Sequence, residues 1–178
     1  MTPSGKATLV ANVVAVACTA SAIHGVPWDP VLPYAVHKTL HLVGVTVLMG
    51  NLSVGPAWLA YAWWRDPPSV PFAVRALVTM DLWLTAPAIV LITLNGLWLA
   101  SAWGGPTGTP WLRDAIAALA VAWAVGPTFT LYWQERVAAT AEAGGPAFTR
   151  ALVWWSVWGT LAMVPMGAAF WWMISKPS

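Results

Sequence analysis

The chain has 178 residues, of which 59% are hydrophobic and only 8% are charged, and its mean hydropathy is +0.68. A soluble domain has about a quarter charged residues, so this composition excludes an ordinary soluble protein and predicts an all-α integral membrane helical bundle. The net charge of +2 comes without any run of basic residues, which excludes a nucleic-acid-binding face.

The first apolar segment covers residues 7–23 and follows Lys6. A basic start, an apolar run and the small residues at 20–22 are typical of a cleaved secretory signal. The same pattern also suits a retained transmembrane helix, which is the reading we expect here. Residues 25–34 contain three prolines and are predicted to form a loop.

Four longer apolar segments follow, separated by breaks that are rich in proline, glycine or charge. They cover residues 35–64, 74–102, 111–133 and 148–174. Each exceeds the roughly 20 residues that cross a bilayer, so we predict five transmembrane helices in one membrane domain spanning 1–178. Within it, 1–34 is an added helix with its loop, and 35–178 is a four-helix core.

The distribution of lysine and arginine predicts the orientation in the membrane. One side of a five-span topology carries five cations: Lys6, Arg65, Arg75, Arg136 and Arg150. The other side carries three: Lys38, Arg113 and Lys176. Because positive residues favour the cytoplasmic side, we expect a bacterial inner-membrane protein with a cytoplasmic N-terminus and a periplasmic C-terminus.

Each of the last four predicted helices has an internal proline: Pro56, Pro87, Pro127 and Pro165. A proline removes one backbone hydrogen bond and tends to kink its helix. In lipid the freed carbonyl needs a partner, so kinks usually face protein or a cavity. The four prolines together predict a bundle that bows around an interior space.

All three histidines are expected near one membrane face, because His24 ends the first predicted helix while His37 and His41 begin the second. His37 and His41 are four residues apart and share a helix face. Neutral imidazole binds haem iron, copper or zinc, which makes all three candidate ligands. Met49 lies on nearly the same face as His41 and adds a soft donor. The alternative is that His37 and His24 are solvated at the interface.

A second polar group is predicted deeper in the bundle. Asp81, on the third predicted helix, is the one acid well inside a predicted span. Asn95 lies on the same helix, Asn51 on the second, and Gln134 closes the fourth. An intramembrane carboxylate is costly, so it indicates function by default. The alternative is a structural role for Asp81, either in a pair with Arg75 on the same helix or in breaking the helix beside Pro87.

Fifteen tryptophans are more than interfacial belts alone require. Belts and helix packing explain many of them. The remaining rings would contact a flat cofactor, a pigment or a quinone, or would pack against a partner protein.

Several short motifs follow one another in a distinctive order from Lys38 onward. KTLHLVGVTVLMGN opens a helix, DLW at 81–83 precedes TAPA at 85–88, and ISKPS closes the chain. This order resembles an uncharacterised bacterial family of predicted integral membrane proteins over about 140 residues. The chain departs from the family pattern by the inserted Leu82 and by Ala88 in place of glycine.

The opening Lys38-x-x-His41 is also similar to that of two better-known groups, the copper-resistance membrane domain and the haem-pathway membrane protoporphyrinogen oxidase. In the oxidase the helix histidine is tied to haem, so the resemblance implies a haem role for His41. The oxidase's Trp-Phe-Ala-Gly-Leu signature is missing, and no soluble-enzyme motif is present, which leaves enzymatic activity open.

Three functions are compatible with these features. The leading hypothesis is a membrane protein that binds haem b or copper through His41, helped by His37 or His24, for electron transfer or metal handling. The second is a non-catalytic accessory subunit that packs through its tryptophans into a larger respiratory or photosynthetic complex, or a homo-oligomer. The third is a small transporter around Asp81 and the proline kinks.

Overall fold

The computed structural model describes residues 1–177, which form helices joined by turns and loops. The first two spans are α1 (Pro3–Ile23) and α2 (Tyr34–Arg65), and the fifth is α7 (Gly145–Ser175). The third span consists of η1 (Pro67–Ser69), α3 (Val70–Met80), η2 (Asp81–Thr85) and α4 (Ala86–Ser101). The fourth span consists of α5 (Pro110–Val125), η3 (Gly126–Thr130) and α6 (Leu131–Thr140). All five are long and apolar enough to cross a membrane. The all-α class and the five spans are therefore confirmed.

The helices extend further than their apolar cores predicted. The fourth predicted helix ended at Trp133, whereas α6 continues to Thr140 through Gln134, Glu135 and Arg136. These residues are good helix formers, and their polar groups find partners on neighbouring helices or at the surface. Loss of hydrophobicity marks where the bilayer core ends, whereas the backbone stays helical for almost two more turns.

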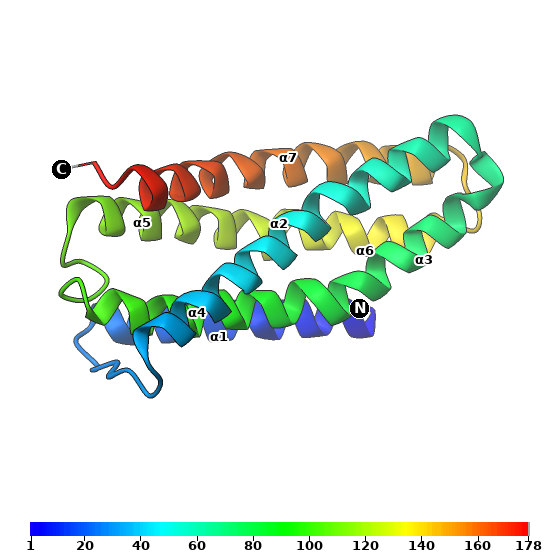
Figure 1. The fold of residues 1–178 in the computed structure, drawn as a ribbon. Coiled ribbons are helices and arrows are strands. Elements are labelled where there is room, and N and C mark those ends of the chain that lie inside the picture. Colours follow the sequence, from blue (N-terminus) through cyan, green and yellow to red (C-terminus); the bar gives the residue numbers. More distant parts are fainter. Residues whose placement is uncertain (178) are drawn as a thin grey trace.

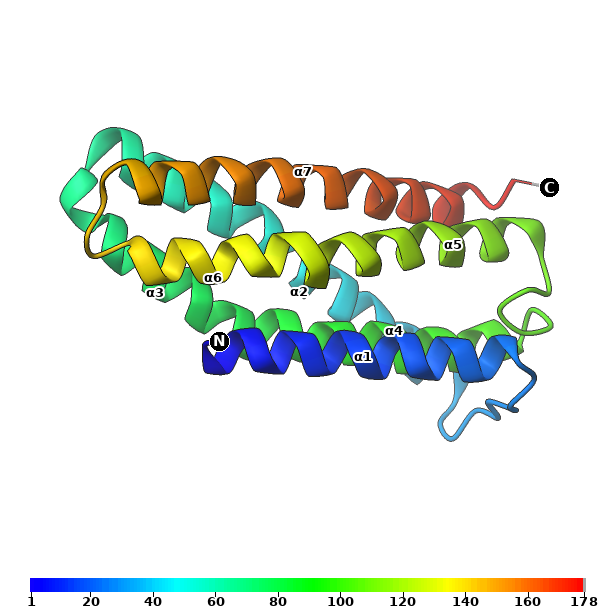
Figure 2. The same ribbon diagram turned by 180° about the vertical axis from the view of Figure 1, so that it is seen from behind.

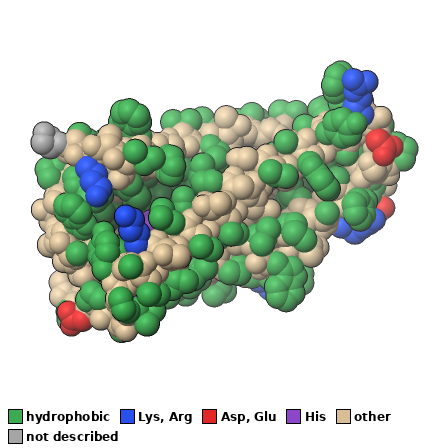
Figure 3. Space-filling model, in the orientation of Figure 1, with side chains coloured by type: hydrophobic (Ala, Val, Ile, Leu, Met, Phe, Trp, Pro, Cys, Tyr) green, Lys and Arg blue, Asp and Glu red, His purple; other side chains and the backbone are tan. Residues whose placement is uncertain are grey.

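The bundle has two groups of helices that meet along part of their length. α4 packs against α1 and α2, and α7 packs along α5 and α6. Figure 1 shows α2 running obliquely across the bundle, and Figure 2 shows α1 lying along α4 from the other side. The N-terminus and the α6–α7 turn lie toward one end, and the C-terminus lies at the other. Nearly all charged side chains visible in Figure 3 gather at the two ends, with a hydrophobic surface between them.

Two apolar clusters hold these groups together. One lies where α2 meets α3 and α6 meets α7, and it includes Leu59, Val74, Val137 and Trp155. The other joins α1, α2 and α4 near the middle of the spans, around Ala15 and other small residues. Small side chains let helix backbones approach closely in a membrane, where lipid gives helices no hydrophobic reason to associate.

Two of the four prolines coincide with wide π-helical turns. Pro87 follows η2, where the Ala86 N–H bonds to the Asp81 carbonyl five residues back. Pro127 lies inside η3, which closes with the equivalent bond from Leu131 to Gly126. π-turns occur frequently at functional sites. Pro56 and Pro165 lie within continuous α-helices instead.

Candidate functional site

A cavity of about 340 Å³ lies inside the bundle, and all five spans contribute to its wall. Most of the lining side chains are aliphatic or aromatic, and none of those from the described residues is a lysine or arginine. Polar groups line it at two levels, which we call the histidine end, at His41, and the aspartate end, at Asp81. Along α2, His41 and Asn51 are ten residues apart, which is about 15 Å of helix.

At the histidine end, the imidazole of His41 is held by the main chain of the neighbouring helix. Its Nδ1 lies 2.9 Å from the carbonyl oxygen of Ile92 on α4. A carbonyl only accepts hydrogen bonds, so Nδ1 carries the proton and the lone pair of the neutral ring is on Nε2. Nε2 has no hydrogen-bond partner among residues 1–177, and His41 lines the cavity.

Four of the six methionines of the chain line the same cavity. They are Met49 on α2 and Met163, Met166 and Met173 on α7. The three on α7 lie in its second half, which is at the same end of the molecule as the first half of α2, where His41 lies. The cavity therefore combines one available imidazole nitrogen with several thioethers.

The sequence offered one signal for the α7 methionines. Met163 and Met166 are three residues apart and so share a helix face. Such a pair also occurs on faces that meet lipid, so the spacing did not mark these two as candidate ligands, and Met49 was the one methionine predicted.

His37 differs from His41 because both of its ring nitrogens are engaged. The Leu32 N–H donates to Nε2 at 3.1 Å, and Nδ1 lies 2.9 Å from Oδ1 of Asn95. Because Nε2 accepts, Nδ1 holds the proton and donates to Asn95. The ring is 1% exposed and also packs against Trp98. In this structure His37 fastens the proline-rich loop and α4 to α2 and has no nitrogen free for a metal.

The structure does not bring the three histidines into one cluster. His24 ends α1 with an exposed side chain, and its backbone N–H caps the Ala20 carbonyl. Among the described residues, no three His, Cys, Asp or Glu side chains form a group that could hold a metal ion. A shared imidazole site for His24, His37 and His41 therefore has no geometric support.

At the aspartate end, Asp81 accepts three hydrogen bonds from side chains on three spans. Asn51 Nδ2 and Thr85 Oγ1 donate to Oδ1, each at 2.8 Å, and Gln134 Nε2 donates to Oδ2 at 2.6 Å. Asp81 is 7% exposed. The predicted deep polar group therefore exists, but without Asn95, which belongs to the His37 network.

The alternative pairing of Asp81 with Arg75 is wrong. Arg75 forms an exposed ion pair with Glu142, beside the α6–α7 turn. Residues six apart on a helix point to different faces, so Arg75 is directed away from the cavity while Asp81 faces it. The carboxylate is instead satisfied by neutral amide and hydroxyl donors.

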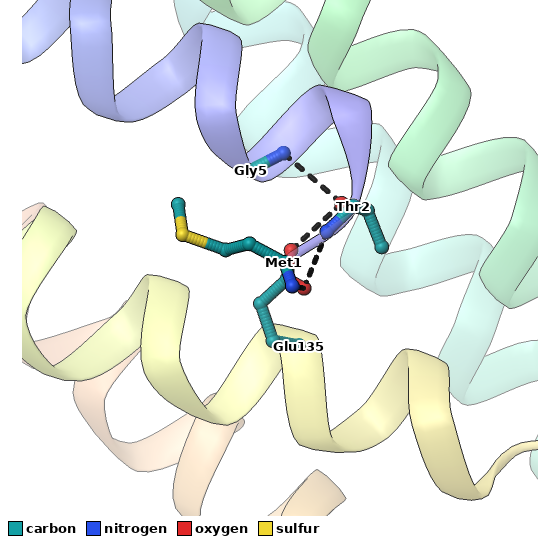
Figure 4. A network of polar contacts seen from close by, with 4 residues as sticks. All are labelled: Met1, Thr2, Gly5 and Glu135. Carbon is teal, nitrogen blue, oxygen red and sulfur yellow. Dashed lines mark hydrogen bonds and ion pairs between the residues drawn. The ribbon is translucent and has the colours of Figure 1, made fainter.

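Glu135 fastens the added first helix to the fourth span (Figure 4). Its two carboxylate oxygens accept from the backbone N–H and the hydroxyl of Thr2, both at 2.7 Å. The same Thr2 hydroxyl accepts from the Gly5 N–H and so caps α1. The N-terminal ammonium lies 3.8 Å from Glu135. α1, which supplies Thr8 and Asn12 to the cavity wall, is thereby held in place.

Comparison with known proteins gives one match. Neither a curated protein nor a solved structure matches the chain significantly. The sequence profile of a family described as "predicted integral membrane protein (DUF2269)" matches residues 35–177, which contain α2 to α7 and both ends of the cavity. α1 lies outside the matched range. The chain belongs to the DUF2269 family of predicted integral membrane proteins.

Proposed function

We propose that this protein binds a redox-active metal centre, a copper ion or a haem iron, through Nε2 of His41. The observation that carries the proposal is the hydrogen bond from His41 Nδ1–H to the Ile92 carbonyl. A metal-binding histidine almost always donates its other ring N–H to a carbonyl, carboxylate or water, which fixes the tautomer and orients the ring. His41 shows this arrangement on the wall of an interior cavity.

The donor set of the cavity suits a soft or borderline metal. Thioether sulfur together with imidazole favours copper(I), and a histidine–methionine pair also holds haem iron in cytochromes. Met49, Met163, Met166 and Met173 supply the sulfur donors. Such a centre, when bound, carries single electrons or holds copper in transit, so we propose electron transfer or metal handling as the role. The Lys38-x-x-His41 opening shared with the copper-resistance domain and the haem-pathway oxidase supports this assignment.

An absorption spectrum and a metal analysis of the gently solubilised full-length protein test the proposal. We expect either a Soret band or about one copper per chain, and the two readouts distinguish the two centres. His41→Ala should lose the centre, while His24→Ala, at an exposed position outside the cavity, should keep it. A colourless wild type that stays metal-free after incubation with haem or with copper(I) would contradict the proposal.

We further propose the orientation in which the N-terminus is cytoplasmic and the C-terminus periplasmic, in a bacterial inner membrane. The five cations on one side against three on the other support it. Alkaline phosphatase fused after residue 178 should then be active, whereas a fluorescent protein fused there, which needs the cytoplasm to fold, should stay dark.

A second candidate function, an accessory subunit of a larger membrane complex, is favoured by Trp83. This residue is near the middle of the third span and is 69% exposed. A tryptophan in a membrane belt lies near an interface, so a belt does not account for Trp83. This function predicts that a defined set of proteins co-purifies with the wild type and is lost in Trp83→Ala. Trp64 is exposed at the end of α2, so Trp64→Ala is the control.

A further inference from the structure

The aspartate end of the cavity contains polar atoms that the protein leaves unpaired. The indole Nε1–H of Trp155 has no hydrogen-bond partner among residues 1–177, although its side chain is 92% buried and lines the cavity. Thr130 lines the cavity as well, and its hydroxyl is also buried without a partner. A buried N–H that makes no hydrogen bond is costly, so such groups call for an explanation.

Asp81 has one acceptor position left close to Thr130, because Gln134, which donates to Asp81, lies one helical turn after Thr130. An ionised carboxylate offers about four lone-pair sites, and Asn51, Thr85 and Gln134 fill three of them. The aspartate end thus contains an indole donor and a hydroxyl without protein partners, together with a free acceptor site. A ligand that satisfies them needs oxygen atoms that accept, or that both accept and donate, hydrogen bonds.

The charge of the cavity limits the ligand to a neutral head group. No lysine or arginine from the described residues lines the wall, and the one ionisable group at the aspartate end is a carboxyl. A phosphate or carboxylate head group would be buried at mid-membrane without a cation to offset it. Phospholipids and fatty acids are therefore disfavoured.

The shape of the cavity admits a ligand with an apolar tail. α2 packs against α3 and α4, α7 packs against α5 and α6, and no extensive contact joins α2 to α7 within residues 1–177. Residues of both helices nevertheless line the cavity. Trp155 also belongs to the apolar cluster of α2, α3, α6 and α7. Figure 3 faces this side and shows a hollow toward the end at which α7 finishes.

We propose that the aspartate end is a binding site for the head group of a lipid-soluble quinone or quinol, whose tail leaves between α2 and α7. The flat ring suits a wall that contains the aromatic side chain of Trp155. One ring oxygen accepts from Trp155 Nε1–H and the Thr130 hydroxyl. In the quinol, a ring hydroxyl donates to Asp81. The site does not require a metal at His41 and is separate from it.

Binding of decylubiquinone to the full-length protein in lipid nanodiscs tests this proposal. We expect saturable binding that Trp155→Phe weakens about tenfold, because this change leaves a smaller aromatic ring and removes the N–H. Thr130→Val should weaken binding in the same direction. Trp154→Phe, an exposed neighbour on the same helix, is the matched control and should bind like the wild type. Trp155→Phe also shrinks a side chain of the apolar cluster, so thermal unfolding is measured beside binding, and Thr130→Val, which changes no member of that cluster, separates a lost hydrogen bond from lost packing.

Three results would overturn the quinone site. They are absence of saturable binding to the wild type, binding that Trp155→Phe and Thr130→Val leave unchanged, and equal competition by a fatty acid or an isoprenoid alcohol of matched length. The last result would mean a general lipid pocket without head-group recognition. His41→Ala should still bind decylubiquinone, so failure of the metal centre and failure of the quinone site remain distinguishable.

Discussion

Gly96 on α4 lies directly behind the imidazole of His41 on α2. A Cβ added to Gly96 would stand 3.2 Å from Cε1 and 3.3 Å from Nδ1 of the ring. These distances are shorter than ordinary van der Waals contacts, so the ring would have to move. Gly96 therefore sets the position of His41 by having no side chain, on the same helix whose Ile92 carbonyl sets its tautomer.

Gly96→Ala should push the His41 ring and lengthen its hydrogen bond to Ile92. We expect at least a tenfold loss of affinity for the metal centre, since partners that orient a ligand typically account for 10- to 100-fold in metal affinity. Titration of the stripped protein with haem or copper(I) measures it. Gly167→Ala on α7, where no atom lies within 4 Å of the new Cβ, is the control. Equal affinity in the two variants would contradict the geometry.

His37→Ala should lower stability while leaving the metal content of the folded protein unchanged. The change leaves the Leu32 N–H and the Asn95 carbonyl oxygen without their partner and opens a void under Trp98. We expect a loss of roughly 2 to 4 kcal/mol in the free energy of unfolding. Unfolding in mixed detergent and metal analysis of the folded fraction check both parts. Loss of the centre without loss of stability would instead make His37 a ligand.

Asp81→Asn should destabilise the bundle by about 1 to 3 kcal/mol, because an amide group would place an N–H₂ donor among three donors. The same mixed-detergent unfolding measures it. Asp114→Asn is the matched control, because Asp114 pairs with Arg113 on the surface, where an ion pair contributes about 1 kcal/mol or less. Equal stability of Asp81→Asn and the wild type would mean that the three donors find other acceptors.

Glu135→Gln should loosen the first turn of α1 without unfolding the other spans. The amide keeps one acceptor oxygen, so either the N–H or the hydroxyl of Thr2 loses its partner. We expect the backbone amides of Thr2 and Gly5 to exchange hydrogen roughly three- to tenfold faster. Glu142→Gln, which removes only the exposed pair with Arg75, should leave these rates unchanged.

The five spans and the deep polar group could be predicted because hydrophobic length and depth are properties of local sequence. Asn51 and Asp81 both lie well inside long apolar runs, and any compact bundle brings such residues to similar depth. The direction in which each polar side chain points around its helix axis then decides which of these side chains meet. Asn95 was expected with Asp81, but lies more than three turns further along and reaches His37 instead.

The different environments of His37 and His41 could not be predicted from sequence. They are four residues apart on one helix, yet one has both nitrogens occupied and the other has one free. The deciding partners are a backbone N–H in the proline-rich loop, a backbone carbonyl and an amide more than fifty residues away. Main-chain groups have no sequence signature, so spacing alone could not separate a structural histidine from an available one.

The wide turn η2 also sets the directions in which the side chains of α4, which follows it in the third span, point around the helix axis. Each residue in an α-helix turns the chain by about 100°, so the extra residue held in Asp81–Thr85 rotates α4 relative to α3 by about that much. Because of this offset, Asp81 faces the cavity while Ile92 and Asn95 face the two histidines of α2. Losing one residue from this turn would keep a continuous, membrane-long helix and still separate both histidines from their partners. A one-residue deletion or insertion at η2 would thus rotate the whole second half of the span about its axis.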